Sequence, residues 1–192
     1  MAPCNTSFTI LAVSFSLAFL TVIKSETMFA RELSARDQFW LKPKKMTHLR
    51  FYLHDTVTGR HPTAVPVAQA ATANASATLF GTVAVVDDPL TVSPDLNSAL
   101  VGRAQAIYAS SSQSELSLTM TMNLVFTEGA YNGSTLSVLG QTPLLKNPRE
   151  LTIVGGTGVF RFARGYIQLR TYAFNKTTRN AIVKYDAYAL HH

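Results

Sequence analysis

Apolar and polar residues alternate along most of the chain from Met46 onward, and a period of two residues is typical of β-strands. The clearest example is 116–126, where every second residue is Leu, Met or Phe. Most residues between them are Ser, Thr or Asn, so one face of this strand is apolar and the other polar. The same alternation predicts strands at 46–55, 79–86, 101–110, 116–126, 135–139, 151–154, 160–171 and 181–190.

The segments between these strands carry turn chemistry and no helical periodicity. Asp87-Asp88-Pro89 ends one apolar run and predicts a tight turn, and Tyr131-Asn132-Gly133 predicts another. Many short strands separated by turns favour an antiparallel all-β barrel or sandwich. We therefore expect one β domain at 46–192, preceded by an arm at 26–45 with Trp40 as its one large apolar anchor.

The N-terminus has the features of a secretory signal peptide. Phe8–Ile23 is a continuous apolar run without charge, which predicts a signal peptide at 1–25 and cleavage near Ser25. No later run is long enough to span a membrane. The only cysteine, Cys4, lies in this leader, so we expect a secreted, extracellular chain without disulfides.

Three sequons follow the leader, and in a secretory chain they are candidate glycosylation sites. They begin at Asn74, Asn132 and Asn175.

The net charge of +6 suits contact with acidic polymers, but the basic residues are scattered. Lys42–Lys45 is the one tight basic cluster, and no aromatic-rich basic motif accompanies it. We therefore expect no nucleic-acid partner.

Asp55 is the first candidate for chemistry. The alternation places it on the face of Phe51 and Leu53, so it points inward if they do. Burial would raise the pKa of its carboxyl group and let it donate a proton near neutral pH. The alternative is that Asp55 begins the Asp-Thr-Val-Thr-Gly turn and caps its amides.

Arg149 and Tyr108 are further candidates. Arg149 shares the alternation of Leu151 and Ile153, and a guanidinium there would seek an anionic or phenolic partner. Its alternative role is a surface salt bridge, for instance with Glu150. Tyr108 ends a face of small residues that either leaves a cavity or makes room for large neighbours, and a buried Tyr can equally be a core residue.

Motifs for a metal ion or a cofactor are weak. Asp87 and Asp88 lack the spaced oxygen ligands of a calcium loop, and the five histidines lack zinc spacing. Gly155–Gly158 has no Lys-Ser/Thr after it, as a phosphate loop requires. We expect no metal and no cofactor, and no motif supports a hydrolase or a redox cofactor enzyme.

Five segments together resemble the plant dirigent proteins, and they cover nearly all of the expected mature chain. They are FYLHDTVTGRHPTAV (51–65), FGTVAVVDDPLT (80–91), VGRAQAIYASSS (101–112), NLVFTEGAYNGSTLSVLG (123–140) and RELTIVGGTGVFRFARGY (149–166).

The resemblance implies an eight-stranded antiparallel β-barrel similar to allene oxide cyclase, usually trimeric, and a homotrimer (or homodimer) is therefore expected. It implies secretion to the apoplast and a stereo-directing auxiliary protein without an oxidative centre of its own. A laccase or peroxidase would supply phenoxy radicals from a monolignol such as coniferyl alcohol, and the barrel would direct their coupling in lignan or phenylpropanoid biosynthesis. Two alternatives stay open: a quinone-methide cyclase or dehydratase, and a non-catalytic cell-wall or defence binding protein.

The resemblance also implies roles for individual residues. Asp55 would protonate a quinone methide or hydrogen-bond a phenol, and Arg149 would orient a phenolic oxygen. The residues that would line the pocket are Tyr108, Thr142, Thr171 and Phe174.

The chain departs from the lignan-forming members at three points. Thr142 stands where they carry a second pocket Asp, and Ser110 where they carry a Tyr. The cysteines that join the arm to the last strand are absent. These departures indicate a divergent subgroup and put a mechanism with two carboxylates in doubt.

Overall fold

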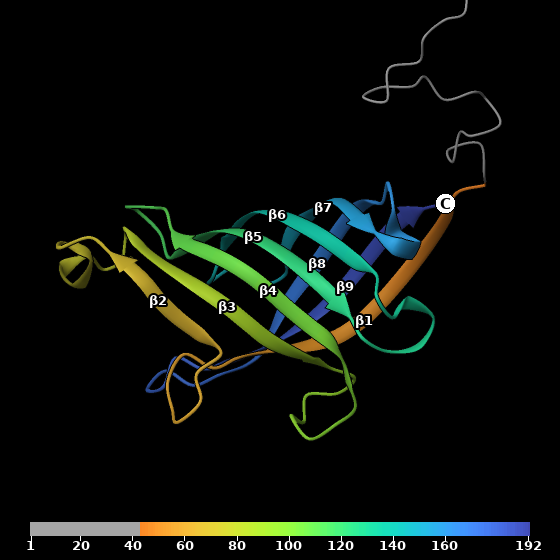
Figure 1. Cartoon of the computed structure of the whole chain (residues 1–192). Helices are drawn as coiled ribbons and strands as arrows, with labels where there is room; N and C mark the ends of the chain where they lie inside the picture. Colours follow the sequence, from red (N-terminus) through yellow and green to blue (C-terminus); the bar gives the residue numbers. More distant parts are fainter. Residues whose placement is uncertain (1–42) are drawn as a thin grey trace, which may run out of the picture. The chain divides into compact units, whose positions relative to one another are not determined.

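The computed structural model describes residues 43–192, and there the chain forms an antiparallel β-barrel (Figure 1). The predicted signal peptide and nearly all of the predicted arm lie outside the described residues. No helix in the described part is long and apolar enough to cross a membrane. The strands are β1 (Lys45–Asp55), β2 (Ala64–Gln69), β3 (Thr82–Thr91), β4 (Leu100–Ser110), β5 (Ser117–Phe126), β6 (Thr135–Pro143), β7 (Arg149–Thr157), β8 (Arg164–Phe174) and β9 (Ala181–His191).

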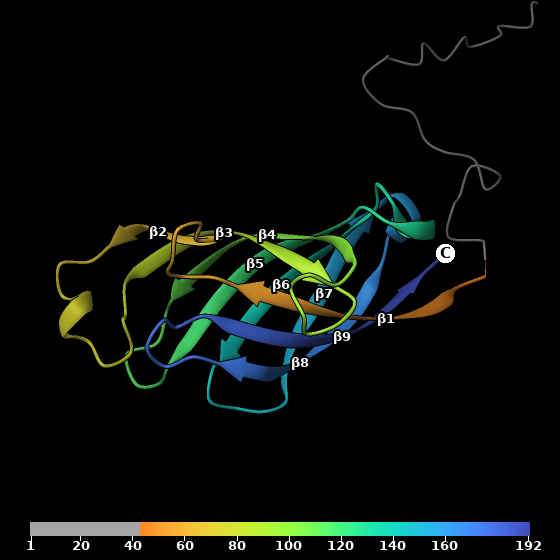
Figure 2. The same cartoon turned by 90° about the horizontal axis from the view of Figure 1, so that it is seen from below.

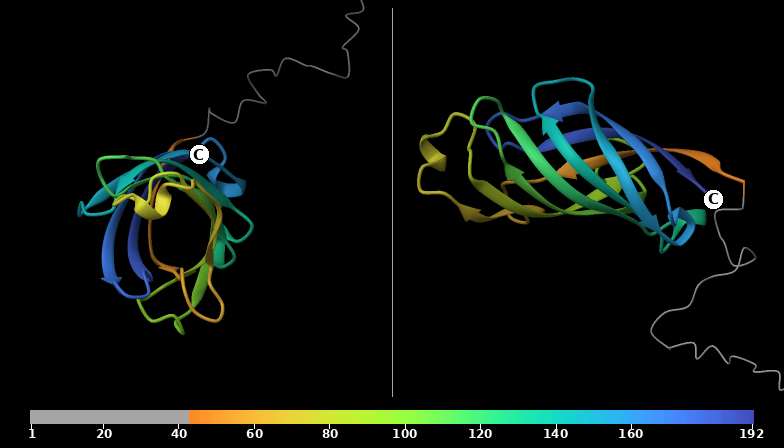
Figure 3. Two further views of the ribbon diagram at one scale, coloured as in Figure 1. Left: turned by 90° about the vertical axis from the view of Figure 1, so that its left-hand side faces the viewer. Right: turned by 90° about the horizontal axis from the view of Figure 1, so that it is seen from above.

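Eight of these strands close into a ring, which confirms the predicted fold. Their order is β1-β9-β8-β7-β6-β5-β4-β3, and β3 pairs with β1 to close it (Figures 2 and 3). The closing seam has only two residue pairs, Tyr52 with Thr91 and Leu53 with Leu90. By contrast, β1 and β9 pair along eleven residues. The seam is therefore the thinnest connection in the ring.

The ninth strand, β2, pairs with the first half of β3 and lies outside the ring. The alternation did not predict it, because Pro66 interrupts the run and five of its six residues are exposed. An exposed proline is tolerated in a strand at the edge of a sheet. Strand β2 pairs with the first half of β3, and β1 pairs with the last two residues of β3 on the same side.

Strand β3 runs through Asp87-Asp88-Pro89, so the predicted tight turn at this motif is wrong. Pro89 fits because the edge of β3 that faces β2 and β1 has no partner at this one residue. Asp87 donates its N–H to Thr63 O, pairing with β2 ends at Val86, and pairing with β1 begins at Leu90. Proline has no N–H group, and because no partner strand accepts a hydrogen bond at this gap, no hydrogen bond is lost.

One end of the barrel is filled by aromatic side chains. Phe51 stacks on Tyr185 with ring centroids 5.5 Å apart, and Phe126 lies 5.7 Å from Phe160. The short helices η4 (Gly129–Tyr131) and η5 (Gly158–Phe160) bring their aromatic residues to this cluster. The small residues of β4 are buried in the same continuous core, so they make room for large neighbours. The third short helix, η3 (Ala73–Ala75), lies between β2 and β3.

A chain of buried hydrogen bonds stabilises the seam between β1 and β3 on the outer face of the barrel. The Thr91 hydroxyl donates to Ser93 O at 2.7 Å and accepts from His54 Nε2 at 2.7 Å. Thr91 is 1% exposed and His54 5%, so water does not replace either bond. Burial lowers the pKa of His54, which keeps its ring neutral.

We predict that Thr91→Val lowers the free energy of unfolding by about 1–3 kcal/mol, because the buried His54 N–H loses its acceptor. Urea denaturation measures the change. Thr135→Val is the matched control, since the Thr135–Thr157 hydroxyl pair is exposed and its loss should cost less than about 0.5 kcal/mol. Equal losses in the two variants would contradict a special role for the seam.

Candidate functional site

The barrel end opposite the aromatic cluster is open to solvent. Inward-facing residues at the cluster end are buried, among them Phe51, Leu136 and Ile153. Towards the other end, inward-facing residues of five strands are partly exposed: Asp55, Tyr108, Met120, Thr171 and Val183. Solvent therefore enters the barrel where the chain places its candidate chemistry.

Asp55 ends β1 and faces the interior, as the alternation predicted. Its Oδ1 atom is buried and has no hydrogen-bond partner. Burial raises the pKa of the carboxyl group to about 6. The alternative role as a turn cap is not seen, because Asn180 Oδ1 accepts from the N–H groups of Val57 and Thr58, and Thr63 Oγ1 accepts from Thr56.

A second carboxyl group, Asp88, lies opposite Asp55. Continuing the register of Leu53 and Leu90 by two residues along each strand pairs Asp55 with Asp88. Asp88 is 2% exposed, and its Oδ1 accepts a 2.5 Å hydrogen bond from the Thr63 hydroxyl. Burial and the neighbouring Asp55 raise its pKa to about 8.

Sequence reasoning missed Asp88 because Asp-Asp-Pro has the composition of a turn. The signal that identifies it is the alternation itself. Ala84, Val86, Asp88 and Leu90 are all buried at a spacing of two residues, whereas Val85 and Asp87 are exposed. Two carboxyl groups therefore share the interior although Thr142 is not acidic.

Phenol groups lie near this pair. Tyr108 faces inward from β4 and is half-buried. Tyr185 faces inward from β9, is 2% exposed, and lies between the two ends, because its ring stacks on Phe51 of the aromatic cluster and its hydroxyl group is close to Asp55 and Asp88. Burial raises the pKa of both hydroxyl groups, and the charges of Asp55 and Asp88 add to the shift. Both phenols therefore stay protonated and can act as hydrogen-bond donors.

Arg149 contacts Thr171 of the adjoining strand, and continuing the register of Val138 with Ile153 by four residues along each strand places Thr142 opposite Arg149 at the β6–β7 hairpin. Arg149 starts β7, is 8% exposed, and makes no surface salt bridge with Glu150 or any other described carboxylate. It donates from Nη1 to Leu144 O at 3.2 Å and from Nη2 to Thr171 Oγ1 at 3.1 Å. Arg149 Nε and Thr142 Oγ1 are buried without partners.

Phe174 and the sequons lie at the surface. Phe174 is 56% exposed at the end of β8 and lines a shallow hollow with Asn175, Asn180 and Ile182. Its cross-strand partner Ala181 also pairs with Asp55, so Phe174 belongs to the rim of the open end. Asn74, Asn132 and Asn175 are all exposed, as glycan attachment requires.

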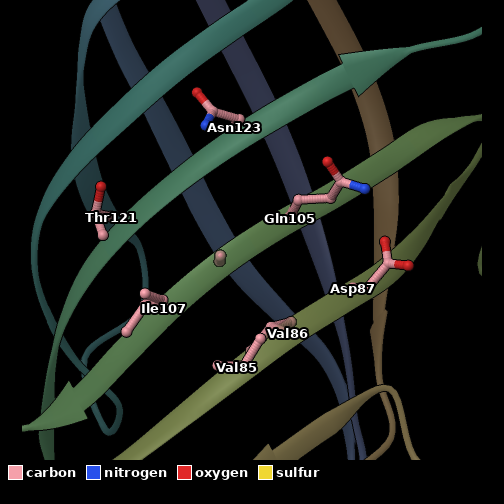
Figure 4. Close-up of a pocket in the computed structure, with 8 residues that line it drawn as sticks. Val85, Val86, Asp87, Gln105, Ile107, Thr121 and Asn123 are labelled. Carbon is pink, nitrogen blue, oxygen red and sulfur yellow. The ribbon is translucent and has the colours of Figure 1, made fainter.

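A second hollow lies on the outer wall of β3, β4 and β5 (Figure 4). Val85 and Ile107 form its apolar part, and Gln105, Thr121 and Asn123 contribute polar atoms. Asp87 also lines it and accepts a 2.6 Å hydrogen bond from Arg103 Nε. This hollow is separated from Asp88 by the thickness of the sheet, because neighbouring residues of a strand point to opposite faces.

Comparison with known proteins agrees with this geometry. The family model described as Dirigent-like protein matches residues 46–190. Dirigent protein 21 of Arabidopsis thaliana is 53% identical over 150 residues, which are 78% of this chain and 79% of that protein. Pterocarpan synthase 1 of Glycyrrhiza echinata is 44% identical over 193 residues, covering 100% of both chains.

Among solved structures, that of the pterocarpan synthase dirigent protein GePTS1 superposes with a TM-score of 0.74 at 50% identity. The match covers 79% of this chain and 87% of that one. The family match spans all but the first and last residues of the barrel strands, and it includes both inward aspartates, Arg149 and Tyr108. This chain therefore belongs to the dirigent protein family.

Proposed function

We propose that the protein binds a phenolic quinone methide, or the alcohol that gives rise to one, at the open end of the barrel. Proton transfer by Asp55 and Asp88 would then control how it reacts. The observation that carries this proposal is the pair of inward carboxyl groups facing each other across the seam, with pKa values raised to about 6 and about 8. Between these values one group holds a proton while the other accepts one, as acid–base catalysis requires.

The reaction that suits such a pair is a ring closure with loss of water. The protonated carboxyl group gives its proton to a benzylic hydroxyl group of the substrate, the C–O bond breaks with its electron pair, and water leaves. A phenol conjugated to that carbon loses its proton to the other carboxylate, which yields the quinone methide.

A second phenol of the same molecule then attacks the exocyclic carbon. Its proton goes to the carboxylate, and the other carboxyl group returns a proton to the quinone oxygen. The ring is aromatic again, and Asp55 and Asp88 together again hold one proton. The net change is one cyclic ether formed and one water released, with no change of oxidation state.

The relatives support this class of reaction over the others. Two of the similar proteins are named pterocarpan synthases, and a pterocarpan contains a cyclic ether of the kind that this ring closure makes. The Glycyrrhiza echinata relative aligns over its entire length. Tyr108 and Tyr185, which lie near the acid pair, can donate hydrogen bonds to the oxygen of the quinone methide.

A second candidate function is stereoselective coupling of phenoxy radicals supplied by a separate laccase or peroxidase. The several relatives named only as dirigent proteins favour it. Coupled monolignol radicals are themselves quinone methides, so the same acid pair would open them to internal attack. The two candidates differ in their need for an oxidase.

One experiment separates them. The protein is incubated with the ring-opened hydrate of a pterocarpan in one arm, and with laccase and coniferyl alcohol in the other. Chiral chromatography with mass detection follows the products. Loss of water without an oxidase supports the first candidate, and an enantiomeric excess only in the laccase arm supports the second. No excess over controls in either arm would contradict both.

Asp55→Asn and Asp88→Asn should each lower the rate of the reaction that this experiment detects by about 10²–10⁴-fold, because an amide cannot transfer the proton. Asp87→Asn is the matched control. It changes the neighbouring residue on the outer wall and should leave the rate within about twofold. Circular dichroism checks that all three variants fold. A loss of rate in Asp87→Asn as large as in Asp88→Asn would count against the acid pair.

The raised pKa of Asp88 also predicts how stability depends on pH. The folded state holds a proton up to about pH 8, whereas an unfolded Asp loses it near 4. Stability is therefore lost as pH rises between these values, at about 1.4 kcal/mol per pH unit. His54, with a lowered pKa, acts in the opposite direction, but only below about pH 6.5.

Wild-type protein should therefore become less stable from about pH 6.5 to 8 in thermal or urea unfolding. Asp88→Asn should show little dependence in this window, because the titrating group is gone. A slope in Asp88→Asn equal to that of the wild type would mean that another group is responsible.

The location, glycosylation and oligomeric state of the protein are also predictions. We propose that the chain is secreted to the apoplast, carries glycan on at least one of Asn74, Asn132 and Asn175, and forms a homotrimer. Exposed Val85 and Ile107 on the outer wall give a second copy an apolar surface to pack against. Sedimentation equilibrium of the secreted protein should give the mass of three chains. Glycosidase treatment should lower this mass by the mass of the glycans removed. A monomer at micromolar concentration would contradict the assembly.

A further inference from the structure

Arg149 carries a buried positive charge that no described carboxylate compensates. A guanidinium group stays protonated in proteins, so the charge is permanent. Burying it without a counter-ion is costly. Burial lowers the pKa of Arg149, in keeping with this cost.

The carboxylates of the described part are engaged or directed elsewhere. Asp186 pairs with Arg50 and Lys184 on the outer surface, and Asp87 pairs with Arg103. Glu150, next to Arg149, is exposed on the opposite face of β7. Asp55 and Asp88 form no ion pair with Arg149 and lie across the interior at the seam.

The surroundings of Arg149 also leave hydrogen-bonding capacity unused. Its two hydrogen bonds go to neutral acceptors, Leu144 O and Thr171 Oγ1, and account for two of its five N–H donors. Arg149 Nε has no partner. The Thr142 hydroxyl, 2% exposed and facing inward from the same hairpin, has none either. A buried cation beside an unused hydroxyl group matches a carboxylate, which accepts several hydrogen bonds at once.

We propose that Arg149 and Thr142, with Thr171, form a subsite for a carboxylate group on the ligand. The barrel would then prefer a phenol that carries an acid side chain to a neutral phenol of the same shape. This inference rests on the proposed function for the location of the ligand inside the barrel. It adds a substrate class, the hydroxycinnamic acids and related phenolic acids. A simple hydroxycinnamic acid has one phenol and no benzylic hydroxyl group, so it suits the second candidate function, the coupling of phenoxy radicals. The acid pair would face the phenolic part of the molecule, and the cation its carboxylate.

Binding of a matched pair of ligands tests the proposal. Ferulic acid and coniferyl alcohol differ only in the carboxylate or CH₂OH at the end of the side chain. Titration calorimetry at about pH 6, where such a carboxyl group is ionised, should show the acid binding at least about tenfold more tightly. Equal affinities, or no binding of either ligand, would overturn the subsite.

Two Asp substitutions sharpen the test. Thr142→Asp puts a carboxylate beside Arg149. It should remove the preference for the acid, because the protein's own carboxylate then compensates the charge of Arg149. Thr121→Asp adds the same charge on the outer wall and should keep the preference. Arg149→Gln should also remove the preference. A preference that persists in Thr142→Asp, or is lost equally in Thr121→Asp, would overturn the proposal.

The binding experiment is independent of turnover. A protein that prefers ferulic acid but converts neither substrate in the product experiment would refute the proposed function and leave the subsite standing. A protein that yields one stereoisomer but binds ferulic acid and coniferyl alcohol equally would support the proposed function and refute the subsite.

Discussion

The site depends on a seam of two residue pairs. Tyr52 with Thr91 and Leu53 with Leu90 are the only pairs that join β1 to β3, and they close the eight-stranded ring. The same register carries Asp55 and Asp88 to facing positions two residues further on. Without closure, β1 and β2 would be the edges of an open sheet, the second half of β3 would lose its partner, and the two acids would be separate and solvated. Because they are adjacent and poorly hydrated, their pKa values rise to about 6 and about 8.

The interior is divided between packing and chemistry. Aromatic residues of β1, β5 and the short helices fill one end and give the barrel a rigid core, and Tyr185 of β9 lies between this end and the acid pair. The other end holds carboxyl, phenol and guanidinium groups, and three of its polar atoms are buried without partners: Asp55 Oδ1, Thr142 Oγ1 and Arg149 Nε. Unsatisfied buried groups weaken a fold, so their concentration at one end is expected of a site whose partner is a ligand.

The alternation of residues was sufficient to predict most of the strands and the shared face of Asp55 and Arg149 with apolar neighbours, whereas the choice of a closed eight-stranded barrel over a sandwich came from the resemblance to dirigent proteins. The alternation failed where composition suggested something else. Asp87-Asp88-Pro89 has turn composition but continues β3, because the proline lies at the one gap in the pairing on that side. β2 was missed because its first five residues, Ala64–Ala68, are apolar or proline, so apolar and polar residues do not alternate in it. The pairing of Asp55 with Asp88 depends on which residues of β1 and β3 meet at closure, a long-range property that local pattern does not contain.

The most direct test of the account is a pH titration of the aspartate carboxyl groups by ¹³C NMR, with Asp55→Asn and Asp88→Asn used for assignment. If the two acids face each other at the seam, the midpoints lie near 6 for Asp55 and near 8 for Asp88, and the midpoint of Asp88 falls once Asp55 is neutralised by substitution. Two independent midpoints near 4, unchanged by either substitution, would contradict this arrangement, because the acids would then be solvated and unable to share a proton.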